Sequence, residues 1–171
     1  METQRQNILV RGCIGNDRSA QKELYEAYRG PMFSLCMRVT GNYEDARDAL
    51  QDGFISVFRD IAKFRAEAGL GSWIKTIMLR SALKRIRRMN FMGEENIPDT
   101  TVDFDAEFTG EELHRAIMEL SDGYRAVFMM YEVEGYSHRE IADMLGISEG
   151  TSKSQLFYAK RKLKETLKNY R

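Results

Sequence analysis

The 171-residue sequence predicts an all-α protein with two small helical domains joined by an acidic linker, the second domain containing a helix-turn-helix. Glycine and proline are sparse, at 13 and 2 residues, and apolar residues recur at helical spacing almost throughout. No segment shows the strict alternation of a half-buried strand. We place the first domain at residues 5–90, the linker at 91–109 and the second domain at 110–171.

The first domain is expected to begin with two helices. The first covers residues 19–28, with Leu24, Tyr25 and Tyr28 on its inner side, and the second covers residues 31–39. Gly41 follows the second helix and is expected to end it.

Asn42 can cap a third helix over residues 43–63, which carries an apolar seam along one side. Asp45, Asp48 and Asp52 form an acidic stripe on its outer side, with no basic residue on the same stripe. Like charges at this spacing repel each other unless a partner supplies the opposite charge. The acidic stripe therefore indicates either a docking surface for a basic partner or a plain solvated face.

Two glycines mark a loop over residues 65–71, after which Ser72 is expected to cap a helix over residues 73–88. Four basic residues share one face of that helix: Arg80, Lys84, Arg87 and Arg88. A cationic face beside a flexible loop suits a phosphate backbone and unstacked bases. The alternative is a solvated face, and Trp73 is expected to pack in the core in either case.

The formal net charge of zero conceals a segregation of charge along the chain. Residues 75–88 contain six basic and no acidic residues, and residues 94–112 contain eight acidic and no basic ones. Residues 153–171 contain seven basic residues against Glu165 alone. Two basic blocks on either side of an acidic one suggest two contacts with nucleic acid.

The second domain is expected to contain a helix-turn-helix centred on residues 136–148. Ser137 and Glu140 form a capping-box pattern, so a helix should begin at His138 and end at Gly146. Ser148 can cap the second helix.

The second helix of this motif has an inner seam and an outer face. Short polar residues near the start of the outer face suit base edges in the major groove, and the cations further along suit phosphates. The alternative is an ordinary helical hairpin with a solvated charged face. The predicted seam contains Ser152, a hydroxyl that either loosens the packing or bonds to its own backbone. The outer face comprises Thr151, Ser154, Gln155, Tyr158, Arg161 and Lys162.

Composition excludes several other classes of protein. A content of 43% hydrophobic and 30% charged residues is typical of a soluble globular protein, and no apolar run exceeds the six residues 126–131. We therefore expect a cytoplasmic protein without membrane insertion. Cys13 and Cys36 lack the spacing of metal ligands, so we expect reduced buried thiols and neither a metal nor a cofactor.

In this order, the two halves resemble the extracytoplasmic-function (ECF) sigma factors of bacterial RNA polymerase. Residues 24–33 and 40–54 resemble the family's regions 2.1 and 2.2, and residues 64–88 resemble regions 2.3 and 2.4. Residues 120–137 and 148–156 resemble region 4. Arg80 and Lys84 replace an Asn and an Asp that are common in region 2.4, so the family's −10 preference does not carry over directly.

The resemblance implies a factor that directs core polymerase to promoters and opens the −10 element without catalysis of its own. It implies docking on the clamp helices of the largest polymerase subunit and on the flap of the second-largest, and control by an anti-sigma factor. The implied docking residues are Asp45, Asp48, Gln51, Asp52 and Phe54.

The same resemblance assigns two sets of DNA contacts. In the family, the loop before the basic helix captures a base extruded from the non-template strand of the −10 element. The implied −10 contacts are Trp73, Lys75, Arg80, Lys84, Arg87 and Arg88. The implied −35 contacts are Arg139, Thr151, Lys153, Ser154, Gln155, Tyr158 and Arg161.

Two other functions are weighed against this one. A helix-turn-helix regulator that leaves the housekeeping sigma factor in place would usually carry a ligand pocket, a phosphoacceptor or a dimerisation helix in its first domain, and we find no pattern for any of these. An enzyme acting on nucleic acid would need clustered carboxylates, or a nucleophile with a base, and His114 and His138 offer no such arrangement.

Overall fold

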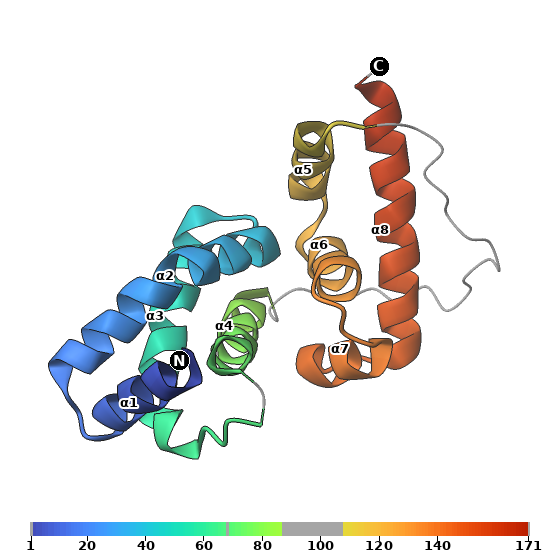
Figure 1. Ribbon diagram of the computed structural model, residues 1–171. Helices are drawn as coiled ribbons and strands as arrows, with labels where there is room; N and C mark the ends of the chain where they lie inside the picture. Colours follow the sequence, from blue (N-terminus) through green and yellow to red (C-terminus); the bar gives the residue numbers. More distant parts are fainter. Residues whose placement is uncertain (1, 68, 87–107, 171) are drawn as a thin grey trace. The chain divides into compact units, whose positions relative to one another are not determined.

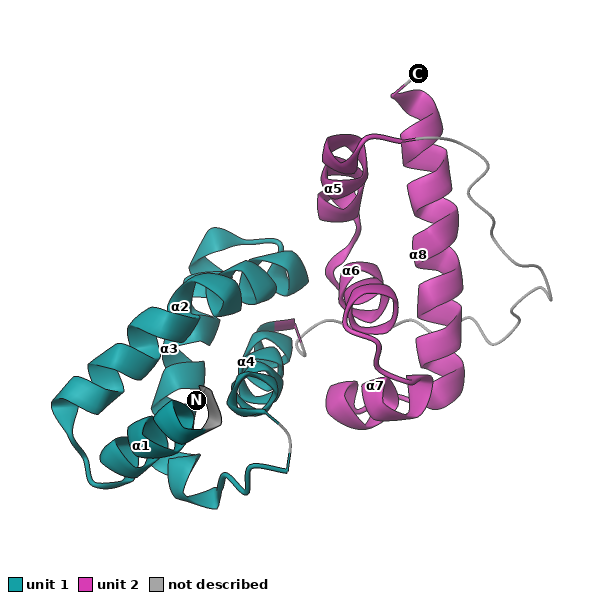
Figure 2. Cartoon of the chain, viewed as in Figure 1, with its two compact units in different colours: residues 1–85 teal, residues 86–171 magenta. Residues whose placement is uncertain are grey.

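A computed structural model describes residues 2–67, 69–86 and 108–170 of the chain (Figure 1). The described residues form helices and connecting loops without a β-strand, so the all-α prediction is confirmed. The chain divides into two compact units, residues 1–85 and 86–171, which Figure 2 colours separately. Most of the predicted acidic linker lies outside the described residues.

Unit 1 contains α1 (Glu2–Ile14), α2 (Arg18–Thr40), α3 (Tyr43–Asp60), the 3₁₀ turn η1 (Ile61–Lys63) and α4 (Leu70–Ile86). The sequence did not reveal α1, because it buries few apolar residues and has no clear seam. It lies close against α2: a Cβ atom added at Gly12 would come within 2.6 Å of the Cβ of Ala20. Asp17 caps α2 by accepting a hydrogen bond from the backbone N–H of Ser19.

The prediction of two helices over residues 19–39 is wrong, because α2 runs unbroken through Pro31. Proline lacks the N–H that would bond to the preceding turn, which usually ends a helix. Here both halves bury one continuous face, which includes Leu24, Met32 and Leu35. Gly41 ends the helix in the left-handed region at φ 68°, as predicted.

Helix α3 begins as predicted, with the Asn42 side chain accepting a hydrogen bond from the N–H of Asp45. Its seam buries five residues: Ala46, Ala49, Gly53, Phe54 and Val57. The side chain of Met78 on α4 packs directly against Gly53, since an added Cβ would lie 2.2 Å from the sulfur of Met78.

Helix α4 begins at Leu70 rather than at Trp73, so the prediction that Ser72 caps it is wrong. The N–H groups of Ser72 and Trp73 both donate to the carbonyl of Gly69, which places Ser72 inside the first turn. Leu70 is fully buried, and this burial favours the earlier start. Trp73 is half-buried beside Phe64, with ring centroids 5.6 Å apart, so it is only partly in the core.

Unit 2 contains α5 (Gly110–Glu119), α6 (Asp122–Phe128), the π-helical turn η2 (Met129–Val133), α7 (His138–Leu145) and α8 (Glu149–Asn169). Arg125 of α6 is 3% exposed, and its contacts link the end of α5 to the start of α6. Its guanidinium donates to the carbonyl of Leu120 at 2.6 Å and pairs with Asp122. Charge-assisted bonds of this kind satisfy a cation that would otherwise be costly to bury.

The helix-turn-helix forms as predicted from α7 and α8. The capping box of Ser137 and Glu140 is complete, and Gly146 ends α7 at φ 70°. Ser148 caps α8 by accepting a hydrogen bond from the N–H of Thr151. Within the described ranges, no helix is long and apolar enough to cross a membrane.

Candidate interfaces for a protein partner and for nucleic acid

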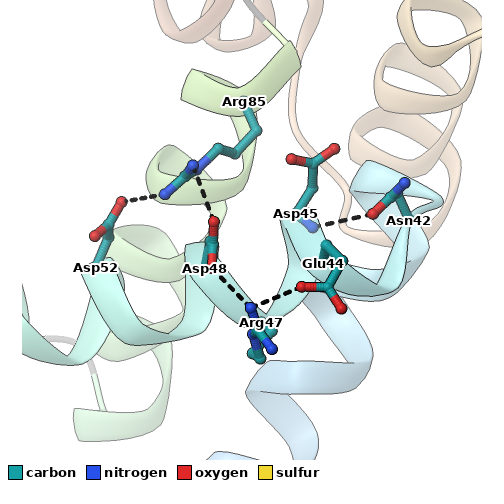
Figure 3. Close-up of polar contacts among 7 residues, drawn as sticks. All are labelled: Asn42, Glu44, Asp45, Arg47, Asp48, Asp52 and Arg85. Atoms are coloured by element: carbon teal, nitrogen blue, oxygen red, sulfur yellow. Dashed lines mark hydrogen bonds and ion pairs between the residues drawn. The ribbon is translucent and has the colours of Figure 1, made fainter.

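The acidic stripe on α3 is partly neutralised, contrary to the sequence prediction. The guanidinium of Arg85 on α4 lies 2.7 Å from Asp52 and 3.3 Å from Asp48 (Figure 3). Arg47 adds a longer contact of 3.8 Å to Asp48. Among the described residues, only Asp45 of the stripe makes no ion pair. Helical periodicity could not reveal Arg85, because it belongs to another helix 33 residues away from Asp52.

The remaining candidate docking residues on α3 differ in exposure. Gln51 is exposed and lies beside the stripe. Phe54 is 4% exposed and packs against the ring of Tyr25 at 4.7 Å. Phe54 therefore packs in the interior of unit 1, and it does not lie on an exposed face as the sequence predicted.

A hollow lies between α2 and α3 on the surface of unit 1. It has a volume of about 470 Å³, and three of its nine lining residues are aromatic. Tyr43 is 61% exposed there and meets Phe33 edge to face at 5.5 Å. Helical spacing alone does not predict this hollow, although the aromatic residues at positions 25, 33 and 43 are a signal for it. We call it the aromatic hollow; it is lined by Tyr25, Glu26, Arg29, Gly30, Pro31, Phe33, Tyr43, Arg47 and Leu50.

The loop before α4 forms a smaller pocket of about 220 Å³. Ala66 adopts a left-handed conformation at φ 58°, which is strained for a residue with a Cβ. The rings of Phe64 and Trp73 supply aromatic surface, and Arg65 supplies positive charge. Glu67 also lines the pocket, and Lys63 pairs with Asp60 at 2.6 Å. Aromatic surface beside cations is what a single unstacked base and its phosphate require.

The basic face of α4 is accessible as far as the structure describes it. Arg80 and Lys84 are exposed and make no ion pair with the described residues. Lys75 is half-buried. Arg87 and Arg88 lie outside the described residues.

The predicted reading face of α8 is only partly accessible. Lys153 and Arg161 are exposed, and Arg161 contacts Glu165 at 3.4 Å. The predicted contact Arg139, which lies on α7, is also exposed. Thr151 and Tyr158 are half-buried.

Two residues of the predicted reading face are buried, contrary to the expectation that they point outward. Ser154 and Gln155 are 2% and 4% exposed. The hydroxyl of Ser154 donates to the carbonyl of Thr151 at 3.0 Å, so its own helix already uses it. Both side chains are therefore buried in this conformation and do not form part of an exposed face.

Ser152 connects the two helices of the motif. Its hydroxyl lies 2.9 Å from Nδ1 of His138, the first residue of α7, and Ser152 is fully buried. The His138 ring also stacks on Tyr131 of η2, with centroids 4.4 Å apart. Both sequence hypotheses for Ser152 are therefore replaced by a cross-helix hydrogen bond.

His138 has a lowered pKa in this environment. Burial is the largest cause, and the nearby charge of Lys153 adds to it, while Glu149 acts in the opposite direction. A second polar link lies further along α8, where Lys160 pairs with Glu132 of η2 at 2.5 Å. Polar contacts that helical periodicity does not predict thus join α8 to α7 through Ser152 and to η2 through Lys160.

The described part of the chain contains no group of three or more His, Cys, Asp or Glu side chains arranged to hold a metal ion. Cys13 and Cys36 are free and buried, and burial raises the pKa of the Cys36 thiol to about 11. A thiol with this pKa is protonated at neutral pH and is a poor nucleophile.

Two family profiles match the chain in the order of its units. Sigma-70 region 2 matches residues 24–91, and Sigma-70, region 4 matches residues 110–163. The ECF RNA polymerase sigma factor SigM of Mycobacterium tuberculosis is 32% identical over 162 residues, which cover 93% of this chain and 83% of that protein. The RNA polymerase sigma factor YlaC of Bacillus subtilis is 26% identical over 161 residues, covering 88% and 93%.

Solved structures show the same fold. The sigma factor RpoE of Bartonella quintana, crystallised with the anti-sigma factor NepR, is 19% identical with a TM-score of 0.56, over 88% of this chain and 98% of that one. CnrH in complex with the cytosolic domain of CnrY is 19% identical with a TM-score of 0.50, over 95% and 96%.

Proposed function

The chain belongs to the ECF sigma factors of RNA polymerase, and on this premise we propose which of its surfaces bind polymerase, the −10 element and the −35 element. A sigma factor gives core polymerase its promoter specificity. The residue assignments rest on the charged surfaces that both units expose within the matched regions. Unit 1 has the acidic stripe and the basic face of α4, and unit 2 has the exposed cations of the helix-turn-helix.

We assign polymerase docking to residues 5–90, through the acidic stripe and Gln51. The proposed partner surface is the clamp helices of the largest polymerase subunit, which would have to present basic side chains to the stripe. Asp45 is the most available carboxylate, since it makes no ion pair with the described residues. The aromatic hollow beside α3 offers the same partner a contact for apolar side chains.

The −10 element is assigned to the loop pocket and the basic face of α4. A base that leaves the duplex loses a few kcal/mol of stacking, which contact with Trp73 and Phe64 would offset. Arg80 and Lys84 would bind the phosphates on either side, and Arg87 and Arg88 would extend this path.

The −35 element is assigned to residues 110–171. The candidates are the exposed Arg139, Lys153 and Arg161 and the half-buried Thr151 and Tyr158. Helix α8 is the recognition helix, and the flap of the second-largest polymerase subunit is the second protein partner. Residues 91–109 would link the two promoter contacts. Ser154 and Gln155 are left out of the direct contacts because both are buried.

The same premise favours a protein that acts in the cytoplasm, where its polymerase works, and that has no catalytic activity. RpoE was solved with the anti-sigma factor NepR bound, and CnrH with the cytosolic domain of CnrY. An anti-sigma factor for this chain would therefore compete with polymerase for the acidic stripe and the aromatic hollow. A regulator acting beside another sigma factor is not favoured, because region 2 matches residues 24–91 in the same chain.

The docking assignment is tested by measuring the affinity of the full chain for core polymerase. Asp45→Asn/Asp48→Asn is expected to weaken holoenzyme assembly about tenfold or more at low salt, because close charge pairs at an interface contribute more than 1 kcal/mol each. Asp143→Asn in unit 2 removes a charge from an exposed position on α7 and is expected to leave assembly unchanged. Equal affinities for all three proteins would move the docking surface elsewhere.

A further inference from the structure

Arg85 connects the helix assigned to DNA with the stripe assigned to polymerase. Its side chain is 33% exposed, and those of Asp48 and Asp52 are 41% and 57% exposed. Water reaches all three groups, so these ion pairs are weak ones that a competing cation can replace. Figure 3 shows Arg85 extending from α4 to both carboxylates of α3.

The position of Arg85 on α4 sets what it can do once it is released. It directly follows Lys84, and Arg80 lies one turn before Lys84 on the exposed basic face. Successive helical residues lie about 100° apart around the axis. Arg85 therefore points toward α3 while Lys84 faces solvent. Because the arginine side chain is long and has several rotatable bonds, a released guanidinium can turn toward the same phosphates as Lys84.

We propose that Arg85 is a DNA-binding cation that the acidic stripe holds away from DNA in the free protein. A basic surface of the polymerase, once docked on the stripe, takes over Asp48 and Asp52 and frees Arg85 for the promoter backbone. This inference rests on the proposed docking role of the stripe. Since one ligand changes the affinity for the other, the coupling is reciprocal: promoter DNA that binds Arg85 strengthens polymerase docking.

The inference is tested on the free full chain, with a fluorescein-labelled single-stranded oligodeoxynucleotide over a series of salt concentrations. Asp48→Asn/Asp52→Asn removes both acceptors of Arg85 and is expected to raise the affinity by about two- to fivefold, the range for an exposed ion pair. One additional phosphate contact should also steepen the slope of log K against log salt by about 0.7.

Two controls separate the release of Arg85 from a general loss of negative charge. Asp45→Asn and Asp52→Asn each remove one charge from the same stripe, but only Asp52 contacts Arg85. We expect Asp52→Asn to raise the affinity more than Asp45→Asn does. In an Arg85→Gln background, the gain from Asp48→Asn/Asp52→Asn should disappear, whereas Lys84→Gln should lower the affinity in every background.

Thermal melting of each variant is the control for folding, and each variant should keep the cooperative transition of unit 1. The proposal is overturned if Asp48→Asn/Asp52→Asn binds no better than Asp45→Asn, or if its gain persists with Arg85→Gln. Because the assay contains no polymerase, its failure is distinguishable from a failure of the docking assignment, which is measured with core polymerase.

Discussion

The imidazole of His138 and the hydroxyl of Ser152 lie 2.9 Å apart and join the first helix of the DNA-binding motif to the second. The ring stacks on Tyr131 at the same time, so His138 links its own helix α7 to both α8 and η2. The orientation of α8 relative to α7 therefore depends on a buried polar pair as well as on the apolar seam.

Ser152→Ala is expected to destabilise unit 2 by about 1–2 kcal/mol, because it leaves a partly buried imidazole nitrogen without its partner. Chemical denaturation monitored by circular dichroism measures this change. Ser121→Ala is a matched control, since Ser121 is exposed and its side chain makes no capping hydrogen bond. Equal stability of the two variants would show that the hydrogen bond contributes nothing.

The lowered pKa of His138 predicts a pH dependence of stability. The unfolded imidazole has a pKa of 6.5, and the folded one has a lower pKa. As pH falls below 6.5, the unfolded chain therefore binds a proton that the folded unit binds less readily. Stability from this residue is fully present above pH 6.5 and is lost as pH falls through 6.5 toward the folded pKa.

Denaturation at several pH values between 5 and 8 tests this linkage, with His138→Gln as the comparison. The wild-type protein should lose more stability than the variant over the acidic part of this range. Parallel curves would mean that His138 titrates alike in the folded and unfolded states.

Gly53→Ala is expected to destabilise unit 1 by about 1–3 kcal/mol, the usual cost of overpacking, because the new Cβ would meet the sulfur of Met78 at 2.2 Å. Alanine's higher helix propensity offsets at most about 1 kcal/mol of this. Gly110→Ala, on a helix where an added Cβ meets no atom within 4 Å, should be neutral or slightly stabilising. Thermal melting distinguishes the two, and a stabilised Gly53→Ala variant would show that Met78 moves aside freely.

The helix-turn-helix could be predicted from the sequence because its signals are local. Contacts between helices could not be predicted in this way. Ser137, Gly146 and Ser148 act within one or two turns of the chain, so each can be interpreted from its neighbours. Arg85 and His138 make their key contacts with residues 33 and 14 positions away. The burial of Ser154 and Gln155 shows the same limit, because helical spacing gives the face of a residue but not what covers it.

The basic face of α4 should determine how promoter binding depends on salt. If Arg80 and Lys84 bind phosphates, replacing either by glutamine should weaken binding of the holoenzyme to all promoters alike and reduce the salt slope by about 0.9 for each contact in duplex DNA. Titrations of promoter fragments at several ionic strengths measure both quantities. An unchanged slope would remove the residue from the phosphate path.

Thr151 and Arg161 are the accessible residues of α8 most suited to base edges. An alanine variant of a residue that reads a base should lose about 1–3 kcal/mol on the cognate −35 sequence and discriminate less against substituted sequences. Competition with promoter variants tests this. The same loss on every sequence would identify a backbone contact instead.

The central claim, that this chain gives RNA polymerase its promoter specificity, is tested most directly by run-off transcription with purified core polymerase over a pool of genomic promoters. Adding the protein should produce transcripts from a discrete set of start sites that share two upstream motifs at fixed spacing. The absence of any start site stimulated over core polymerase alone would contradict the account.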